Sequence, residues 1–155
     1  MWEASLQSMN VHEYLDKNLV CFLDVDTKEE ALRHLVGYSC TYLQIKPDEF
    51  LKAVIDRENL VSTGVGLGVA VPHAKLPCFE SFFICIGLAK KGIEWQSIDS
   101  SPVRIVFLIG GPDDKQTEYL HILSSLTTAI RDDDLRKQLL AATSPEEVLK
   151  LFEEG

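Results

Sequence analysis

The residues best suited to chemistry stand between Ser62 and His73. In this segment three glycines alternate with apolar residues, at Gly64, Gly66 and Gly68. Glycine tolerates positive φ angles and lets a bulky partner approach the backbone. The apolar residues 69–71 predict a short buried strand that anchors the imidazole of His73, and Pro72 fixes φ immediately before it. Because an unperturbed histidine has a pKa of about 6.5, an imidazole presented beside an open loop is a good nucleophile near neutral pH.

The known nucleotide cradles do not fit this glycine-rich segment. A dinucleotide-binding G-x-G-x-x-G motif would need glycine at position 69 or 71, and both are valine; a P-loop would need a Gly-Lys pair, which the segment lacks. Two alternatives to a nucleophilic His73 stay open. The residue can be a strand-end histidine that only hydrogen-bonds to the backbone. It can also be the base of a hydrolase that uses Ser62 or Thr63, although no orienting acid or nucleophile elbow supports that reading.

The charge balance restricts the partners. Of 155 residues, 15 are Lys or Arg and 24 are Asp or Glu, which gives a formal net charge of −9. A protein that neutralises phosphates of DNA or RNA needs a basic stripe, and the sequence has none, so we expect no nucleic-acid partner. The longest apolar stretches, 82–89 and 103–111, are far shorter than the roughly 20 residues that span a bilayer, so we expect no insertion into a membrane.

The cysteines are typical of a protein with reduced thiols. The sequence contains Cys21, Cys40, Cys78 and Cys85 without a C-x-x-C pair, and its first residues lack the pattern of a signal peptide. We therefore expect a cytoplasmic protein in which all four cysteines serve in packing. No set of His, Cys, Asp and Glu has the spacing of a zinc or calcium site, so we expect no metal and no cofactor.

The elements that must position His73 follow from periodicity and capping signals. In chain order the sequence predicts helices over 27–42 and 47–58, strands over 69–71, 82–88 and 103–109, and helices over 115–131, from 132–134 through 140, and after Ser144. The two longer apolar runs are typical of strands covered on both faces. The predicted fold is therefore a single α/β domain over residues 10–153, a central mixed β-sheet with helices on both faces, after a loosely ordered segment 1–9.

A longer stretch around His73 resembles a known phosphorylation site. The residues from Glu58 to Ala74, with Ser-Thr-Gly at 62–64 and Val-Ala-Val-Pro-His-Ala at 69–74, resemble the signature of enzyme IIA domains of the bacterial phosphotransferase system. The resemblance is to the fructose/mannitol type, type 2, which includes the nitrogen-regulatory IIA proteins. It extends to Ile98-Asp99 and to the apolar segment that begins at Pro102, and it covers roughly residues 10–153.

The resemblance implies roles for the residues of this segment. In the family the histidine is a phosphoryl relay, so His73 would accept the phosphoryl group from a phosphohistidine on an HPr-like carrier. The hydroxyls of Ser62 and Thr63 and the amides of the glycine loop would hold the phosphoryl oxygens. Arg57 matches an arginine that lies beside the family's site; its alternative role is that of a cation at a helix end, favoured by the helix dipole.

The sequence departs from the family pattern at Tyr119. The family has a second histidine near the phosphorylated one, and Tyr119 takes its position, while His121 lies two residues further on and is predicted to point away on the helical wheel. A tyrosine stays uncharged at neutral pH and cannot balance an arriving phosphoryl group as a protonated histidine can. We expect phosphoryl transfer to persist, with a turnover that depends on how Tyr119 is used.

Two branches of the family, and one function outside it, remain open. The Pro-His-Ala-Lys-Leu-Pro run at residues 72–77 looks more like the nitrogen-regulatory branch, in which a regulatory protein is the downstream partner. The alternative is a sugar-specific IIA component that passes the group to the IIB domain of a permease. A regulatory binding module whose histidine is never phosphorylated is the third reading.

Overall fold

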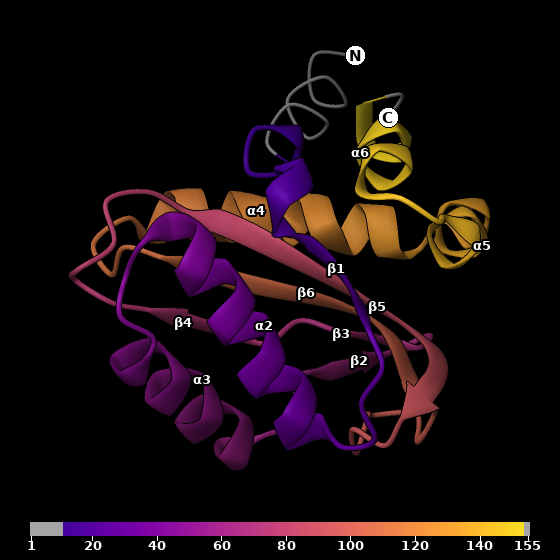
Figure 1. The fold of residues 1–155 in the computed structure, drawn as a ribbon, viewed down its shortest axis with the longest axis horizontal. Helices are drawn as coiled ribbons and strands as arrows, with labels where there is room; N and C mark the ends of the chain where they lie inside the picture. Colours follow the sequence, from indigo (N-terminus) through magenta and orange to yellow (C-terminus); the bar gives the residue numbers. More distant parts are fainter. Residues whose placement is uncertain (1–10, 154–155) are drawn as a thin grey trace.

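The computed structural model describes residues 11–153, and the predicted loosely ordered segment 1–9 lies outside the described residues (Figure 1). The N-terminal third contains a 3₁₀ turn, η1 (Lys17–Leu19), the short strand β1 (Val20–Leu23) and the helices α2 (Lys28–Leu43) and α3 (Asp48–Leu60). Helix α2 begins with the predicted capping box: the Thr27 hydroxyl accepts from the Glu30 amide, and the Glu30 carboxylate accepts from the Thr27 amide.

A six-stranded mixed sheet forms the centre of the domain. Its other strands are β2 (Gly64–Gly66), β3 (Val69–Ala70), β4 (His73–Lys75), β5 (Phe83–Ile93) and β6 (Val103–Gly111). The strand order is β1-β5-β6-β3-β2, and β4 also pairs with β6. The β5–β6 and β2–β3 pairs are antiparallel, while β1 runs parallel to β5, and β3 and β4 run parallel to β6. The predicted mixed sheet is confirmed.

Helices cover both faces of this sheet (Figure 1). The helices α2 and α3 pack on one face, and α4 (Gln116–Ile130), α5 (Asp133–Ala141) and α6 (Pro145–Glu153) pack on the other. Successive residues of β5 point to opposite faces, so Cys85 lies in the core under α2 while Ile84 and Ile86 lie in the core under α4. Because both faces are buried, β5 and β6 read as near-continuous apolar runs.

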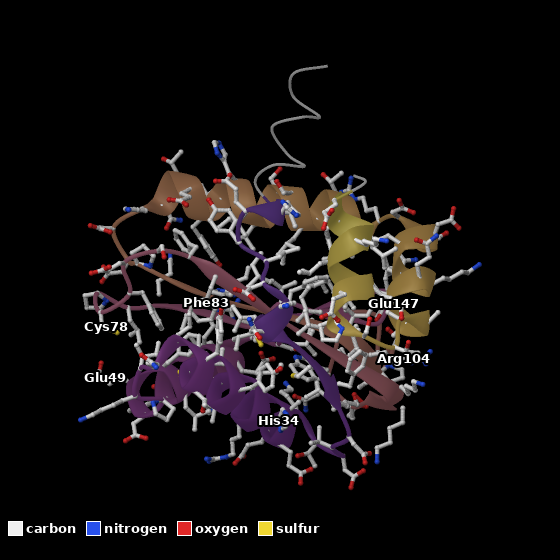
Figure 2. All side chains as sticks on the ribbon, turned by 45° about the horizontal axis from the view of Figure 1, so that its top comes forward. His34, Glu49, Cys78, Phe83, Arg104 and Glu147 are labelled. Atoms are coloured by element: carbon white, nitrogen blue, oxygen red, sulfur yellow. The ribbon has the colours of Figure 1, made fainter. Side chains whose placement is uncertain are left out.

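Charged side chains lie mostly at the surface and apolar ones mostly in the interior. One cysteine departs from the buried position that the sequence predicts. Glu49, Arg104 and Glu147 are exposed and Phe83 is buried, as Figure 2 shows. Three cysteines are buried as predicted, but Cys78 is exposed, so the expectation that all four serve in packing is wrong at this position. Its place beside Pro77, in the turn between β4 and β5, carries it away from both cores.

The glycine-rich segment folds as a tight hairpin rather than as an open loop. Gly66 and Gly68 have φ angles of 95° and 77°, and the φ of Leu67 between them is 60°, so the chain reverses here in the conformation that glycine favours. Gly64 instead lies in β2, which pairs antiparallel with β3. A side chain at Gly64 would collide with Ser97, so glycine at this position lets the backbone of β2 lie close to Ser97.

The predicted strand over 69–71 is one residue shorter in the structure, and a second short strand that the sequence did not predict follows it. The strand β3 ends at Ala70, and β4 starts at His73, with Val71 and Pro72 between them. The Val71 amide donates to the Thr63 carbonyl, and the Pro72 carbonyl accepts from the Ile109 amide. The connection therefore stays bonded to its neighbours although Pro72 has no amide hydrogen to donate.

Candidate active site

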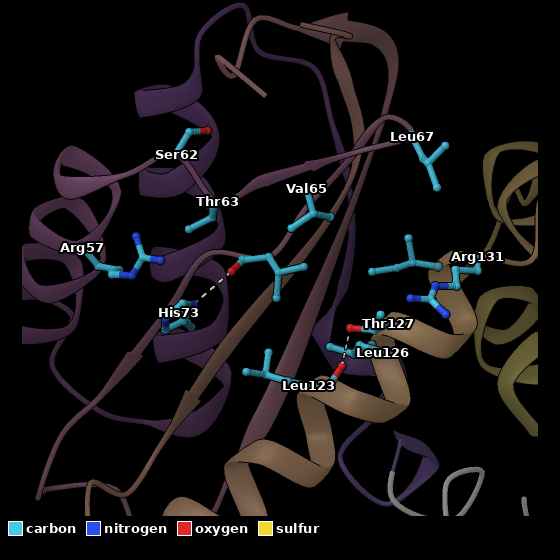
Figure 3. A pocket seen from close by; sticks show the side chains of 12 residues that line it. Arg57, Ser62, Thr63, Val65, Leu67, His73, Leu123, Leu126, Thr127 and Arg131 are labelled. Atoms are coloured by element: carbon cyan, nitrogen blue, oxygen red, sulfur yellow. Dashed lines mark hydrogen bonds between the residues drawn. The ribbon is translucent and has the colours of Figure 1, made fainter. Parts of the chain in front are cut away.

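His73 opens strand β4 on the face of the sheet that α4 covers. Its backbone pairs with Ile109 of β6, and its side chain is half-buried. The Nδ1 atom of His73 lies 3.1 Å from the carbonyl oxygen of Val71 (Figure 3). Because a carbonyl can only accept a hydrogen bond, this contact assigns the proton of the neutral imidazole to Nδ1. The lone pair is then on Nε2.

The surroundings of His73 keep its imidazole neutral. Burial lowers the pKa of His73 below the ordinary value, and the positive charges of Arg57 and Lys75 lower it further. The Val71 carbonyl and the Glu58 carboxylate act in the opposite direction. Desolvation is the largest of these effects, so the free base is favoured at neutral pH.

This environment gives a testable pH dependence. In an NMR titration we expect His73 to have a pKa below the ordinary value of about 6.5. Because the folded pKa lies below the unfolded one, the neutral imidazole's contribution to stability is present above about pH 6.5 and is lost as the pH falls through the folded pKa. A measured pKa at or above the ordinary value would contradict the assignment of a neutral nucleophile.

Tyr119 lies against His73, as the alignment to the family predicts. The ring centroids of Tyr119 and His73 are 5.6 Å apart, and Tyr119 also stacks on Phe82 at 6.1 Å. Burial raises the pKa of Tyr119, so its phenol stays protonated and uncharged. His121, two residues after Tyr119 on α4, is exposed, as its place on the helical wheel predicts. The site therefore contains one imidazole and one phenol.

The position of Arg57 fits both of the readings that the sequence left open. It stands in the last turn of α3, where Nη1 donates to the Val61 carbonyl at 2.7 Å, and so it binds the end of its own helix. It also lines the pocket with His73, and its charge influences the pKa values of both His73 and Tyr119 (Figure 3). Since a guanidinium has five N–H donors, one bond to Val61 leaves donors for an anion.

The hydroxyls of Ser62 and Thr63 are used inside the protein. The Ser62 hydroxyl donates to the Trp95 carbonyl at 2.8 Å and accepts from the Gly64 amide; it points away from His73 in Figure 3. The Thr63 hydroxyl donates to Glu58 at 2.6 Å. Neither hydroxyl hydrogen is directed at His73, and neither hydroxyl is hydrogen-bonded to it among the described residues. The nucleophile–base pair that a hydrolase needs is therefore not formed here.

A buried carboxylate fixes the start of the hairpin. Glu58 is only 5% exposed; its Oε2 accepts from the Thr63 amide at 2.8 Å and from the Lys28 ammonium at 3.1 Å. The indole of Trp95 donates to the Thr63 hydroxyl, which closes the network. Sequence reasoning treated Glu58 only as a position of the signature. The available signal was an acid in the last helical turn, five residues before a threonine.

The tip of the hairpin is held by a second carboxylate. Asp99 accepts from the Leu67 amide at 3.0 Å and from the amide and hydroxyl of Ser101. The bonds from Ser101 and Leu67 lower the pKa of Asp99 to about 2. The left-handed residue Leu67 is thereby fixed with its side chain toward the site.

The pocket beside His73 is a trench between the hairpin and α4. Its volume is about 460 Å³. Arg57 and His73 stand at one end, Arg131 at the other, and apolar side chains line the walls: Val65, Leu67, Val71, Leu123, Leu126 and Ile130 (Figure 3). The imidazole of His73 therefore borders a trench whose walls are mostly apolar.

The described residues contain neither a metal-site cluster nor a membrane-spanning helix. Within residues 11–153, no group of three or more His, Cys, Asp and Glu side chains is gathered as a metal site requires. In the same range no helix has the length and apolar character to cross a membrane.

Comparison with known proteins places the chain in a family. A sequence model of the family described as "Phosphoenolpyruvate-dependent sugar phosphotransferase system, EIIA 2" matches residues 13–155. The nitrogen regulatory protein of Bradyrhizobium diazoefficiens is 31% identical over 130 residues, which cover 84% of this chain and 85% of that protein. The fructose-specific EIIABC component of Bacillus subtilis is 33% identical over 149 residues, or 93% of this chain, but the chain spans only 23% of that protein's length.

Solved structures have the same fold. The nitrogen regulatory protein IIA-Ntr of Neisseria meningitidis superposes with a TM-score of 0.86 at 22% identity, covering 92% of this chain and 98% of that one. The IIA mannitol structure from Escherichia coli gives a TM-score of 0.76 at 25% identity, covering 89% of this chain and 98% of that one. The sheet with helices on both faces is thus the fold of IIA proteins from both branches. Matched by the family's sequence model over nearly its whole length, the chain belongs to the EIIA type 2 family of the phosphotransferase system, the phosphoryl carriers that include sugar-specific and nitrogen-regulatory members.

Proposed function

We propose that His73 is the phosphoryl acceptor of this protein and that Nε2 is the atom that carries the group. The observation that carries the proposal is the contact of Nδ1 with the Val71 carbonyl, which leaves the Nε2 lone pair for reaction. The lowered pKa of His73 supports it, because a neutral imidazole is required for attack. The test is incubation with phosphoenolpyruvate, enzyme I and an HPr-type carrier, followed by intact-mass analysis of this protein.

The transfer balances without a metal ion or a proton donor. The Nε2 lone pair of His73 forms a new N–P bond, the N–P bond of the donor phosphohistidine breaks, and its electron pair returns to the donor's ring nitrogen. If each ring keeps the proton on its other nitrogen, no proton moves. The phosphorylated His73 ring then has imidazolium character, which strengthens its Nδ1–H bond to the Val71 carbonyl. Positioning and charge stabilisation are the remaining tasks of the protein.

Arg57 supplies charge stabilisation in this proposal. Replacing Arg57 with alanine should slow single-turnover transfer from the phosphorylated carrier by about 10- to 100-fold, because one charge-assisted hydrogen bond to a phosphoryl oxygen is lost. Arg57→Lys should recover part of the rate, since it keeps the charge but not the planar fork. The melting temperature must be measured alongside, because Arg57 also binds the Val61 carbonyl. A lower melting temperature with an unchanged transfer rate would make Arg57 purely structural.

Tyr119 supplies packing and a neutral wall against the imidazole. With Tyr119 uncharged, His73 is the group of this pair that titrates near neutral pH, so we expect the transfer rate to show one titration. Tyr119→His should add a second titration and speed transfer at acidic pH, because a protonated imidazole balances the phosphoryl charge. Tyr119→Phe tests the hydroxyl alone, and the assay is the pH profile of single-turnover transfer. If both variants match the parent at every pH, Tyr119 serves only in packing.

The downstream partner belongs to the nitrogen-regulatory branch in this proposal, with a sugar-specific role as the alternative. The run at residues 72–77 and the nitrogen regulatory relatives support the first, and the fructose-specific EIIA component of Haloferax volcanii, 30% identical over 129 residues, favours the second. The discriminating assay offers the phosphorylated protein a fructose-type IIB domain. Retention of the phosphoryl group supports a regulatory role, and rapid loss to the IIB domain supports a sugar-specific one.

A further inference from the structure

Lys75 has an unusual environment for a lysine two residues from the acceptor. Its ammonium lies 4.3 Å from the ring centroid of Tyr119 and donates to Oε1 of Gln116 at 2.6 Å. Both partners stand in the first turns of α4. Within the described part of the chain, no carboxylate lies at ion-pair distance from this ammonium, as the ion pairs of residues 11–153 show. A formal positive charge is thus held beside the site by a π-face and a neutral amide.

The strand geometry places Lys75 within reach of a group on His73. Residues 73 and 75 of β4 point to the same face of the sheet, and their Cα atoms are about 6.6 Å apart along the strand. From this face, the imidazole of His73 contacts the ring of Tyr119, and the ammonium of Lys75 lies over the same ring. A lysine has a flexible four-carbon stem, so its ammonium can turn from Tyr119 toward His73 without any movement of the backbone.

We propose that Lys75 is the second cation of the phosphoryl site. Its ammonium contacts Tyr119 and Gln116 while His73 is unphosphorylated, and it binds a phosphoryl oxygen instead once His73 is phosphorylated. This inference rests on His73 being the acceptor. A phosphoryl group brings a charge of about −1.5 to −2, which attracts an ammonium more strongly than an aromatic face or a neutral amide does. Arg57 then meets the group from α3 and Lys75 meets it from β4.

The movement of the Lys75 ammonium would also make the surface at the start of α4 depend on whether His73 is phosphorylated. When the ammonium leaves, the Gln116 amide loses its donor and the ring of Tyr119 loses its cation. Gln116 is exposed, so the change takes place on the surface at the start of α4. A partner that covers the start of α4 would therefore meet a different surface in the two states.

The test compares Lys75→Met, which keeps the stem and removes the charge, with Lys75→Arg, which keeps the charge. We expect single-turnover transfer from the phosphorylated carrier to Lys75→Met to be at least about tenfold slower than to the parent, and Lys75→Arg to recover most of the rate. The pKa of His73 should rise in Lys75→Met, since Arg57 and Glu58 of α3 and Tyr119 of α4 remain unchanged around it. This rise measures only how close the charge lies to the imidazole, so the transfer rate and the signals of the phosphorylated protein decide whether Lys75 binds the phosphoryl group.

NMR of the Gln116 amide and the Tyr119 ring provides the second readout. On phosphorylation, the Gln116 signal should shift in the parent and stay in place in Lys75→Met, whereas the Tyr119 ring, which lies beside His73, should shift in both but by different amounts. Equal transfer rates in the parent and Lys75→Met, with the same shifts in both, would overturn the inference while leaving His73 as the acceptor. If the parent itself takes up no phosphoryl group on His73, the proposed function fails and the inference fails with it.

Discussion

Replacing His73 with alanine should abolish phosphoryl uptake from an HPr-type carrier and leave the protein folded. The imidazole is the group whose Nε2 is free for attack, while the hydroxyls of Ser62 and Thr63 bind Trp95 and Glu58. Loss of the nucleophile therefore removes the reaction rather than slowing it. The measurement is intact mass after incubation with the complete relay, in which the parent should gain the mass of one phosphoryl group and His73→Ala none.

The matched control is His121→Ala. His121 is exposed on α4, so its removal should leave phosphoryl uptake unchanged. His73→Gln tests the fold without the nucleophile, since an amide can still donate to the Val71 carbonyl. Full phosphoryl uptake by His73→Ala would place the acceptor elsewhere in the chain and refute the proposed function.

Replacing Glu58 with alanine should cost about 3–5 kcal/mol of the free energy of unfolding, the range for breaking one partner out of a buried ion pair. The Glu58 side chain is 3% exposed and that of Lys28 is 19% exposed, so the lysine would lose its counter-charge in a place that water reaches poorly. The amide and hydroxyl of Thr63 would also lose their acceptor. Urea unfolding of the two proteins measures the difference.

Two further variants separate the causes. Lys52→Ala removes an ion pair of similar length, 2.7 Å to Asp56, but both side chains are more than half exposed, so we expect a loss of no more than about 1 kcal/mol. Glu58→Gln keeps the size and an acceptor oxygen for Thr63 and should lose less than Glu58→Ala. If Glu58→Ala unfolds at the same urea concentration as Lys52→Ala, the carboxylate does not hold the hairpin.

The fold could largely be predicted because its signals are local. The capping box at Thr27 and Glu30 and the apolar runs in β5 and β6 depend on residues close in sequence, and each was confirmed. The hairpin was missed because its strands are two and three residues long, too short for a period-two pattern to appear. Its pairing depends on contacts with the distant Ser97 and Asp99, which supply tertiary rather than local information.

The site could be predicted in part, for a similar reason. The sequence singled out His73, Arg57 and Tyr119, and the structure brings these three together around one pocket and its rim. The sequence did not reveal that the Thr63 hydroxyl donates to Glu58. That bond depends on a buried carboxylate whose other partner, Lys28, is 30 residues away in the chain. The role of Lys75 likewise depends on the packing of β4 against α4, which no local pattern reveals.

The most direct test of the account identifies the phosphorylated atom in the parent protein. Heteronuclear NMR of the ¹⁵N-labelled, phosphorylated protein distinguishes a phosphoryl group on the two ring nitrogens of His73. The Nδ1–H bond to the Val71 carbonyl predicts an N–P bond at Nε2, with the Nδ1 proton retained. A phosphoryl group on Nδ1, or on any residue other than His73, would contradict the account.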